Sequence, residues 1–250
     1  MGLCEEPRID QTAALPGPLA DRYELVWADE FDGTTLDPAK WDYRQLGKRG
    51  PALVVKDTVA LDGKGHLVLT VQRVGDQIHA AMIGTQGKFE TTYGYFECRV
   101  RMQRSYGPCS AFWLQSSTMG RPVGDPGKAG VEIDVFECFA PKSNQVTHTL
   151  HWDGYGTNHK SFGSKNRAVA KLTEGFHTIG VEWMPAEYIF YADGKESFRT
   201  TNAVSHAKEY LILSYLADSW QAKVVEQTPG FSDSVVFDYV RVYKKKPGTQ

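Results

Sequence analysis

The 250-residue chain lacks the features that mark several large classes of protein. It has no apolar run near the ~20 residues that a membrane-spanning helix needs, and residues 1–10 lack the basic and apolar regions of a signal peptide. The formal net charge is only −2, so nothing favours binding to nucleic acid or to an anionic membrane. The four cysteines do not have the paired spacing of a zinc site: they are Cys4, Cys98, Cys109 and Cys138.

Length and composition are those of a globular protein with a sizeable core, since 41% of the residues are hydrophobic and 23% are charged. We found no internal repeat and no linker. We therefore expect an N-terminal extension over residues 1–22 and one domain over residues 23–250. Cys98 and Cys138 lie in strand-like segments, and we interpret them first as buried small hydrophobic residues and second as disulfide partners.

An alternation of period two dominates the chain. It runs through residues 65–71, 95–102, 178–183, 188–191, 210–216 and 235–243. Asp193-Gly194 predicts a tight hairpin turn, because both residues tolerate a positive φ. No long segment has a helical stripe, and only residues 202–208 could form a short helical turn. Many short strands without crossover helices predict an all-β fold, an antiparallel β-sandwich or jelly roll.

One strand-like segment, residues 130–139, carries three acidic residues. Glu132 and Asp134 would share one face of an extended strand, with the apolar side chains between them on the core side. Continued alternation would then bury Glu137 in the core, at a high free-energy cost. A β-bulge near Val135-Phe136 would add one residue and return Glu137 to the face of the other two acids.

Three acids on one face repel one another, and no lysine or arginine lies between them in the sequence. Glycoside hydrolysis uses such a pattern, because two carboxyl groups must flank the scissile bond. The spacing predicts that Glu132 and Glu137 lie roughly 5–6 Å apart, as a retaining mechanism requires. Asp134 could share a proton with Glu132 and tune the pKa values of both. A solvated acidic strand that binds calcium is the alternative.

The segment from Glu132 to Glu137 resembles the E-x-D-x-x-E signature of glycoside hydrolase family 16, in its bulged form. Other segments resemble the family's opening strand, its YGxFExR strand, its FHxxxxEW…DG hairpin and its closing strand: residues 27–33, 88–99, 176–194 and 237–243. The resemblance implies a jelly roll with a concave substrate cleft. It also implies that Glu132 is the nucleophile, Asp134 its helper and Glu137 the general acid/base.

The resemblance further implies residues that bind the sugar, whose apolar faces stack on aromatic rings. Trp113 and Trp220 match cleft tryptophans of the family. His151 resembles a family histidine near the catalytic acids, although a satisfied strand histidine is an equal alternative, and Trp152 follows it. Glu97 could line the cleft or form an ion pair across the sheet, and the sequence leaves both open.

Family members often hold a structural calcium ion on the convex face. The matching residues here are Glu30, a backbone carbonyl near Gly65, and Asp238. Calcium prefers such oxygen ligands, but Glu30 and Asp238 could equally be ordinary edge or turn acids. The ion would stabilise the fold, and we expect no cofactor for catalysis.

Two segments depart from the pattern of many family members that act on β-1,3-glucan. A Trp-Pro pair before Trp113 is replaced by Pro108-Cys109-Ser110, and a Gly-Gly pair before Trp220 is missing from residues 215–219. Both segments would contact the substrate. The chemistry is therefore unaffected, while the identity of the polysaccharide stays open.

These features predict a retaining endo-glycosidase that hydrolyses internal β-linkages of a polysaccharide, with β-1,3- or mixed β-1,3/1,4-glucan as the first choice. The alternatives are a galactan of the agar, carrageenan or host-glycan type, and a non-catalytic carbohydrate-binding sandwich, which would not need all three acids. We expect a monomer whose partner is the polysaccharide, with no nucleic acid or membrane bound. A secreted or periplasmic location follows from the position of such polymers outside cells, not from a signal.

Overall fold

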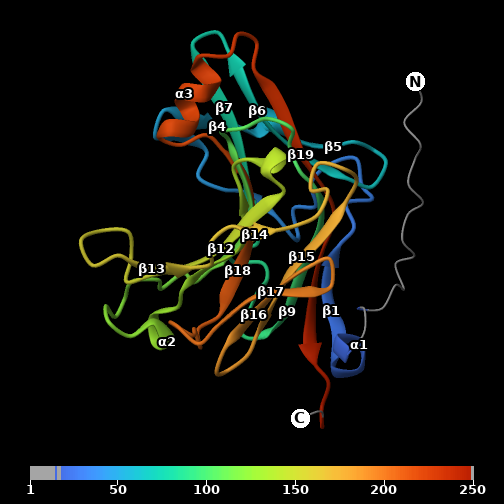
Figure 1. Ribbon diagram of the computed structural model, residues 1–250, viewed down its shortest axis with the longest axis vertical. Coiled ribbons are helices and arrows are strands. Elements are labelled where there is room, and N and C mark those ends of the chain that lie inside the picture. Colours follow the sequence, from blue (N-terminus) through green and yellow to red (C-terminus); the bar gives the residue numbers. More distant parts are fainter. Residues whose placement is uncertain (1–14, 16–17, 249–250) are drawn as a thin grey trace.

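The computed structural model describes Leu15 and residues 18–248 and contains two stacked β-sheets (Figure 1). One sheet has the order β17 (Lys195–Thr200), β16 (Tyr188–Ala192), β15 (His177–Trp183), β9 (Gly94–Arg101), β19 (Ser232–Lys245) and β6 (Leu67–Val74). In the same sheet, β1 (Tyr23–Asp29) pairs with β19, and β5 (Val59–Leu61) pairs with β6.

The second sheet has the order β7 (Gln77–Gly84), β18 (Glu209–Leu216), β10 (Cys109–Gln115), β11 (Glu132–Cys138), β12 (Gln145–Trp152) and β13 (Lys160–Gly163). Strand β7 also pairs with β6 and so joins the two sheets. Within the described residues, the pairings are antiparallel except that of β4 with β7. The remaining elements are short: β2 (Asp42–Tyr43), β3 (Gly47–Arg49), β4 (Ala52–Val54), β8 (Glu90–Thr91), β14 (Arg167–Ala168), α1 (Pro18–Arg22), α2 (Pro126–Ala129), α3 (Trp220–Glu226), η1 (Lys56–Thr58) and η2 (Pro141–Ser143).

The predicted all-β sandwich is therefore confirmed. The hairpin turn is confirmed as well, since Asp193 and Gly194 join β16 to β17 with φ values of 48° and 71°. The short helical turn expected at residues 202–208 is not helical. A helix forms instead at α3, where Ala222 and Val225 are buried and tertiary packing outweighs weak local helix preference.

The core lies between the two sheets and is filled by alternate side chains of their strands. Phe96, Cys98 and Val100 of β9 are buried there, as the alternation predicts. Cys98 and Cys138 are free and buried, which confirms that they act as small hydrophobic residues. Cys4 lies outside the described residues.

The outer face of the β9 sheet is covered in part by the N-terminal segment. Leu15 and Leu19 pack against Tyr23, Tyr95 and Tyr243 in a second, smaller apolar cluster. The expected boundary after residue 22 falls at the junction of α1 and β1, while residues 1–14 and 16–17 lie outside the described residues. The division into an extension and one domain stays a prediction.

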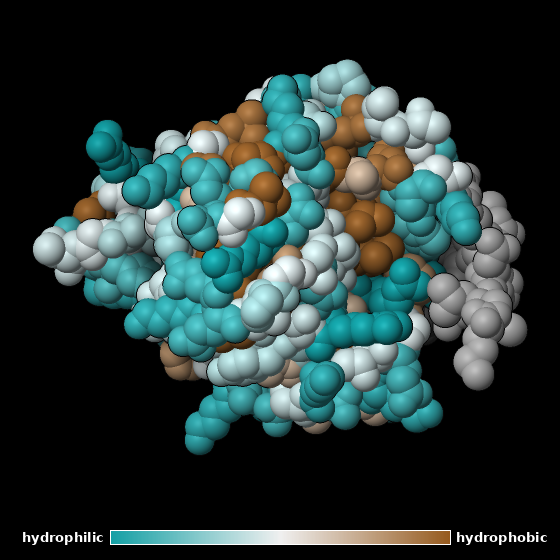
Figure 2. Space-filling model, turned by 90° about the horizontal axis from the view of Figure 1, so that it is seen from above, coloured by the Kyte–Doolittle hydropathy of each residue, from teal (hydrophilic) through white to brown (hydrophobic). Residues whose placement is uncertain are grey.

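No helix in the described part of the chain has both the length and the apolar character needed to cross a bilayer. Seen from the end that carries α3 in Figure 1, the surface is mostly hydrophilic, with apolar side chains in limited patches between polar ones (Figure 2).

Candidate active site

The three acids of β11 lie on a bulged strand. Asp134 pairs with Thr149 of β12 and Glu137 pairs with Thr147, so three steps on β11 match two steps on β12. The register against β10 also shifts by one residue, because the partners of Trp113 and Phe112 are Asp134 and Phe136. Val135 is skipped. The predicted β-bulge is therefore confirmed at Val135-Phe136, and it returns Glu137 to the face of Glu132 and Asp134.

Gly130 precedes β11, and any other residue at this position would force neighbouring atoms to move. Gly130 has a φ of 83°, and a Cβ atom there would lie 2.1 Å from the Cβ of Ser116. Both the left-handed backbone and the close contact therefore require glycine. This constraint restricts the backbone two residues before Glu132.

A buried histidine contacts the bulge from the core side. The Nδ1 atom of His148 lies 2.6 Å from the carbonyl oxygen of Val135, and its Nε2 atom lies 2.9 Å from Oγ of Ser197. Because a carbonyl only accepts, Nδ1 carries the proton and Nε2 accepts from the serine. Burial lowers the pKa of His148 to about 4, so the ring is neutral near pH 7.

The bulged strand forms one wall of a cavity of about 420 Å³. Because side chains alternate along a strand, every second residue of β10 also faces this cavity, as do Ser214 and Leu216 of β18. The lining is Gln45, Arg49, Cys109, Ala111, Trp113, Gln115, Glu132, Asp134, Glu137, Phe139, Tyr155, Ser214, Leu216, Asp218 and Gln221. All three predicted catalytic acids are in this set.

Glu132 receives two hydrogen bonds at the same oxygen. The amide of Gln115 donates to Oε2 at 2.9 Å, and the hydroxyl of Tyr155 donates to Oε2 as well. Burial raises the pKa of Glu132, the bond from Tyr155 opposes this effect, and the charge of Glu137 adds to it.

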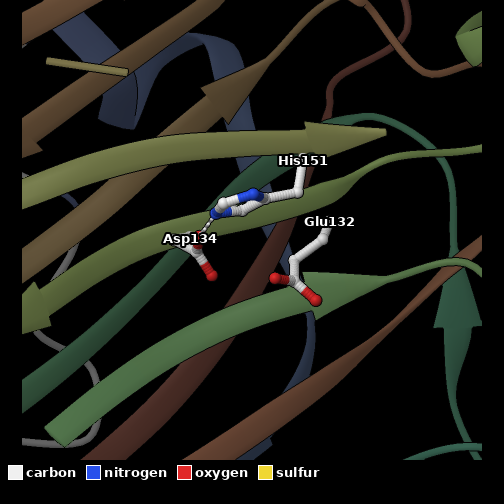
Figure 3. A group of neighbouring side chains, drawn as sticks. All are labelled: Glu132, Asp134 and His151. Carbon is white, nitrogen blue, oxygen red and sulfur yellow. Dashed lines mark ion pairs between the residues drawn. The ribbon is translucent and has the colours of Figure 1, made fainter. Parts of the chain in front are cut away.

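Asp134 and His151 meet above the strand pair β11–β12. The Nε2 atom of His151 lies 3.3 Å from Oδ2 of Asp134, and the other ring nitrogen lies 2.9 Å from His159. One ligand atom each of Glu132, Asp134 and His151 lies within 4.8 Å of the others (Figure 3). Burial, together with the charges of Glu137 and Glu132, raises the pKa of Asp134 well above its usual value.

Glu137 is held by the neighbouring strand, because its Oε2 atom accepts a hydrogen bond from Oγ1 of Thr149 at 3.3 Å. Burial raises the pKa of Glu137, and the charge of His151 opposes that shift. Asp134 is buried and the two glutamates are half-buried. Three adjacent acids with raised pKa values can keep at least one shared proton near neutral pH. The site can therefore both donate a proton and present a carboxylate.

Two of the predicted aromatic residues lie at or beside the cavity. Trp113 lines it and is 7% exposed, with its indole N–H bonded to Oγ of Ser214 at 3.1 Å. Trp220 is 42% exposed and packs against Tyr106 and Phe139, of which Phe139 lines the cavity. These aromatic surfaces suit the apolar faces of sugar rings.

The structure does not bring two other predicted binding residues to the cavity. Trp152 lies on the core side of β12 and packs against the main hydrophobic cluster. Glu97 lies on the outer face of the β9 sheet, 4% exposed, and accepts hydrogen bonds from Tyr95 and Tyr239 at 2.8 Å each. The expectation that these two residues bind substrate was wrong, because each side chain faces away from the cavity.

The residues expected to bind calcium do not form an open oxygen site. Both carboxylate oxygens of Glu30 pair with Arg241, at 2.8 and 3.0 Å. Asp238 pairs with Arg99 at 2.7 Å and lies 3.6 Å from His66, the residue after Gly65. A calcium ion needs oxygen ligands that converge on one point, and arginines occupy the carboxylates here, so the arrangement does not fit the ion.

The cavity also contains residues that we did not predict from the sequence. Gln115 continues the alternation that begins at Trp113, and this periodicity could have identified it. Tyr155 belongs to an irregular segment between β12 and β13, where no periodic pattern exists. Nothing in the sequence indicates that its hydroxyl reaches Glu132.

The combination of a bulged carboxylate strand, a polar cavity and a β-sandwich defines the class of glycoside-cleaving enzymes. The model of the glycosyl hydrolases family 16 matches residues 51–240, which is most of the chain. The protein therefore belongs to this family and is a glycoside hydrolase.

Curated relatives and solved structures agree with this assignment. The chain is 29% identical over 255 residues to a β-glucanase of Rhodothermus marinus, covering 90% of this chain and 86% of that one. It is 27% identical over 239 residues to a keratan-sulfate endo-1,4-β-galactosidase of Sphingobacterium multivorum, covering 89% of this chain but 55% of that one. The catalytic domain of an endo-1,3-β-glucanase (laminarinase) from Thermotoga petrophila superposes with a TM-score of 0.70, at 25% identity, over 90% of this chain and 98% of that one.

Proposed function

We propose that this protein is a retaining endo-glycosidase that hydrolyses internal linkages of β-1,3-glucan or mixed β-1,3/1,4-glucan. The observation that carries the proposal is the bulge at Val135-Phe136, which turns Glu132, Asp134 and Glu137 into one cavity. Two carboxyl groups that line one sugar-sized cavity can flank a scissile bond, as the double-displacement reaction needs.

In the proposed reaction, Glu137 begins protonated and donates its proton to the leaving glycosidic oxygen. Its raised pKa supports this role, because an acid must hold a proton near the working pH. Glu132 attacks the anomeric carbon and forms a glycosyl-enzyme. Glu137 then takes a proton from water, which releases the sugar with its original anomeric configuration.

Asp134 lies between the two glutamates and contacts His151. Its strongly raised pKa makes it a proton reservoir for its neighbours. When Glu132 becomes esterified in the intermediate, one negative charge leaves the cluster, and the pKa values of the remaining acids fall. This change would favour ionised Glu137 at the moment when a base is required.

The choice of glucan rests on relatives. A β-glucanase and two endo-1,3-1,4-β-glycanases of Rhizobium meliloti are among the proteins similar to this chain. A galactan is the second candidate, because the keratan-sulfate β-galactosidase and a β-porphyranase of Zobellia galactanivorans are also similar. An external location of the enzyme would follow from either polymer.

The catalytic proposal requires no metal ion. A structural calcium ion at Glu30, Gly65 and Asp238 is not part of it, because Arg241 and Arg99 already balance the two carboxylates.

A substrate panel tests the proposal. We expect the wild-type protein to release reducing oligosaccharides from laminarin or lichenan faster than from agarose, carrageenan or mucin-type glycans, with products sized by chromatography. The E132Q and E137Q variants should lose nearly all turnover, whereas E24Q, which changes an exposed glutamate of β1, should keep it. Normal turnover by E132Q would disprove the assignment of the nucleophile.

Two further measurements test the retaining mechanism and the separate roles of the two glutamates. Proton NMR of the first product should show the retained anomer, and an inverted anomer would rule out the double displacement. E137Q should lose much less activity on an aryl glycoside with an acidic phenol than on polysaccharide, because that leaving group needs little protonation. E132Q should lose activity on both substrates equally.

A further inference from the structure

We propose that Arg44 is a positioning residue that acts through Gln115 to hold the nucleophile, so that Oε1 of Glu132 is the atom that attacks the sugar. This inference rests on the proposed function. It concerns a residue that lies outside the cavity lining and 88 positions before Glu132 in the chain.

Arg44 reaches the back of the cavity from the segment that follows β2. One of its terminal nitrogens donates to Oε1 of Gln115 at 2.7 Å and to the hydroxyl of Tyr210 at 2.8 Å. The other donates to Gln86 at 2.8 Å, near the surface. The guanidinium group therefore connects the protein surface to a buried polar group behind the catalytic strand.

The hydrogen bonds leave only one orientation for the amide of Gln115. Its Oε1 atom accepts from Arg44 and also from the hydroxyl of Tyr210, at 2.6 Å. An amide has its acceptor on one side and its two donors on the other. With two donors facing Oε1, the NH2 group must face Glu132, and it does so at 2.9 Å from Oε2.

The same arrangement distinguishes the two oxygens of Glu132. Gln115 and Tyr155 both donate to Oε2, and each bond lowers the electron density available on that atom. Oε1 receives neither of these bonds and is the better nucleophile. If Gln115 flipped, its carbonyl oxygen would face the carboxylate, and the repulsion would turn Glu132 away from the attack geometry.

Without Arg44, Gln115 would keep only one of the two donors that fix its orientation. The R44M variant retains the length of the aliphatic stem but has no donor. We expect kcat to fall by about 10- to 100-fold with little change in KM, because the hydrogen bond to the nucleophile matters in the transition state rather than in substrate binding. R44K should recover part of the loss, since an ammonium group can replace one of the bonds.

A double-mutant cycle is the decisive experiment, measured on the polysaccharide that the wild-type protein cleaves best. Q115L alone should lower kcat at least as much as R44M, and adding R44M to Q115L should change nothing further, because Arg44 acts only through Gln115. The control double mutant combines R49M with Q115L. Arg49 lines the cavity but bonds to Asp218 and Gln45 instead, so the effects of R49M and Q115L should multiply.

Q86L provides the control for the outer end of Arg44, and its kcat should stay within about twofold of the wild type. Thermal unfolding of each variant checks that the fold is intact. Effects of R44M and Q115L that multiply, a change in KM alone, or an unchanged kcat in R44M would each overturn the inference. A wild-type protein that cleaves no polysaccharide would instead overturn the proposed function, so the two failures are distinguishable.

Discussion

The contact between His148 and the bulge gives the sharpest prediction about how the fold supports catalysis. Replacing His148 with leucine keeps a side chain of similar volume between Phe190 and Phe198, with which the ring now stacks. It removes the donor that bonds to the carbonyl of Val135 at 2.6 Å. The bulge is thereby deprived of its hydrogen bond from the core.

The expected loss of stability follows from the two hydrogen bonds of His148. A buried carbonyl that loses its donor costs about 1–3 kcal/mol, and the loss of the bond to Ser197 adds about 0.5–1.5 kcal/mol. The effect on activity should be larger than stability alone suggests. The bulge sets the direction of Glu137, and a misplacement of about 1 Å can lower the rate about 100-fold.

Urea unfolding and steady-state kinetics on H148L and S197A measure both effects. S197A removes only the partner of Nε2, so we expect it to lose about 0.5–1.5 kcal/mol and to keep its kcat. H148L should lose stability and kcat together. If H148L is destabilised but turns over at the wild-type rate, the bulge is set by the pairing of β10, β11 and β12 alone, and the proposed support by His148 is refuted.

Three further predictions concern other buried or paired groups. Y155F removes one of the two donors to Glu132 and should lower kcat about tenfold on the best polysaccharide, and an unchanged rate would show that the bond has no catalytic role. Burial raises the pKa of Glu209 to about 8, whereas in the unfolded chain it titrates near ~4.3. Between these two pKa values, the folded state holds a proton that the unfolded state has lost. The free energy of unfolding therefore falls as the pH rises from about 4.3 towards 8, by at most about 1.4 kcal/mol per pH unit. Below about pH 4.3 the contribution of Glu209 is complete. In urea unfolding between pH 5 and 8, E209Q should show a smaller decline than the wild type, and identical slopes would contradict the burial argument. Because arginines pair with Glu30 and Asp238, a chelator should leave the unfolding temperature unchanged, and a clear rise on adding calcium would contradict this expectation.

The fold class and the bulged acidic strand β11 were predictable because both depend on short-range patterns. Alternation identified the strands, and a glutamate that would otherwise fall in the core predicted the bulge at Val135-Phe136. The cost of burying a charge is large enough that one misplaced acid in the pattern is informative. Similarly, Asp193-Gly194 required a tight turn wherever the strands on either side of it lay.

The wrong predictions of substrate-binding residues arose where the same alternation of side chains fits two different environments. Glu97 is on the face opposite the core, as alternation predicts, but that face belongs to the other sheet and is covered by tyrosines and the N-terminal segment. Trp152 has the composition of a sugar-binding residue, yet it lies on the core side of β12. Alternation shows which residues share a face of a strand, but it does not show which part of the protein or the solvent that face contacts.

The sequence by itself determined which acids share one face of β11, the residues that we propose carry the chemistry, since the order of acidic and apolar side chains along one strand allows few conformations. The tertiary structure decided what surrounds those acids. Arg44, Tyr155 and His148 come from three separate segments, and no local pattern relates them to Glu132 or to the bulge. Hydrogen bonds between such distant residues exist only after the sheets have paired and stacked, because only then do the side chains come within about 3 Å of each other.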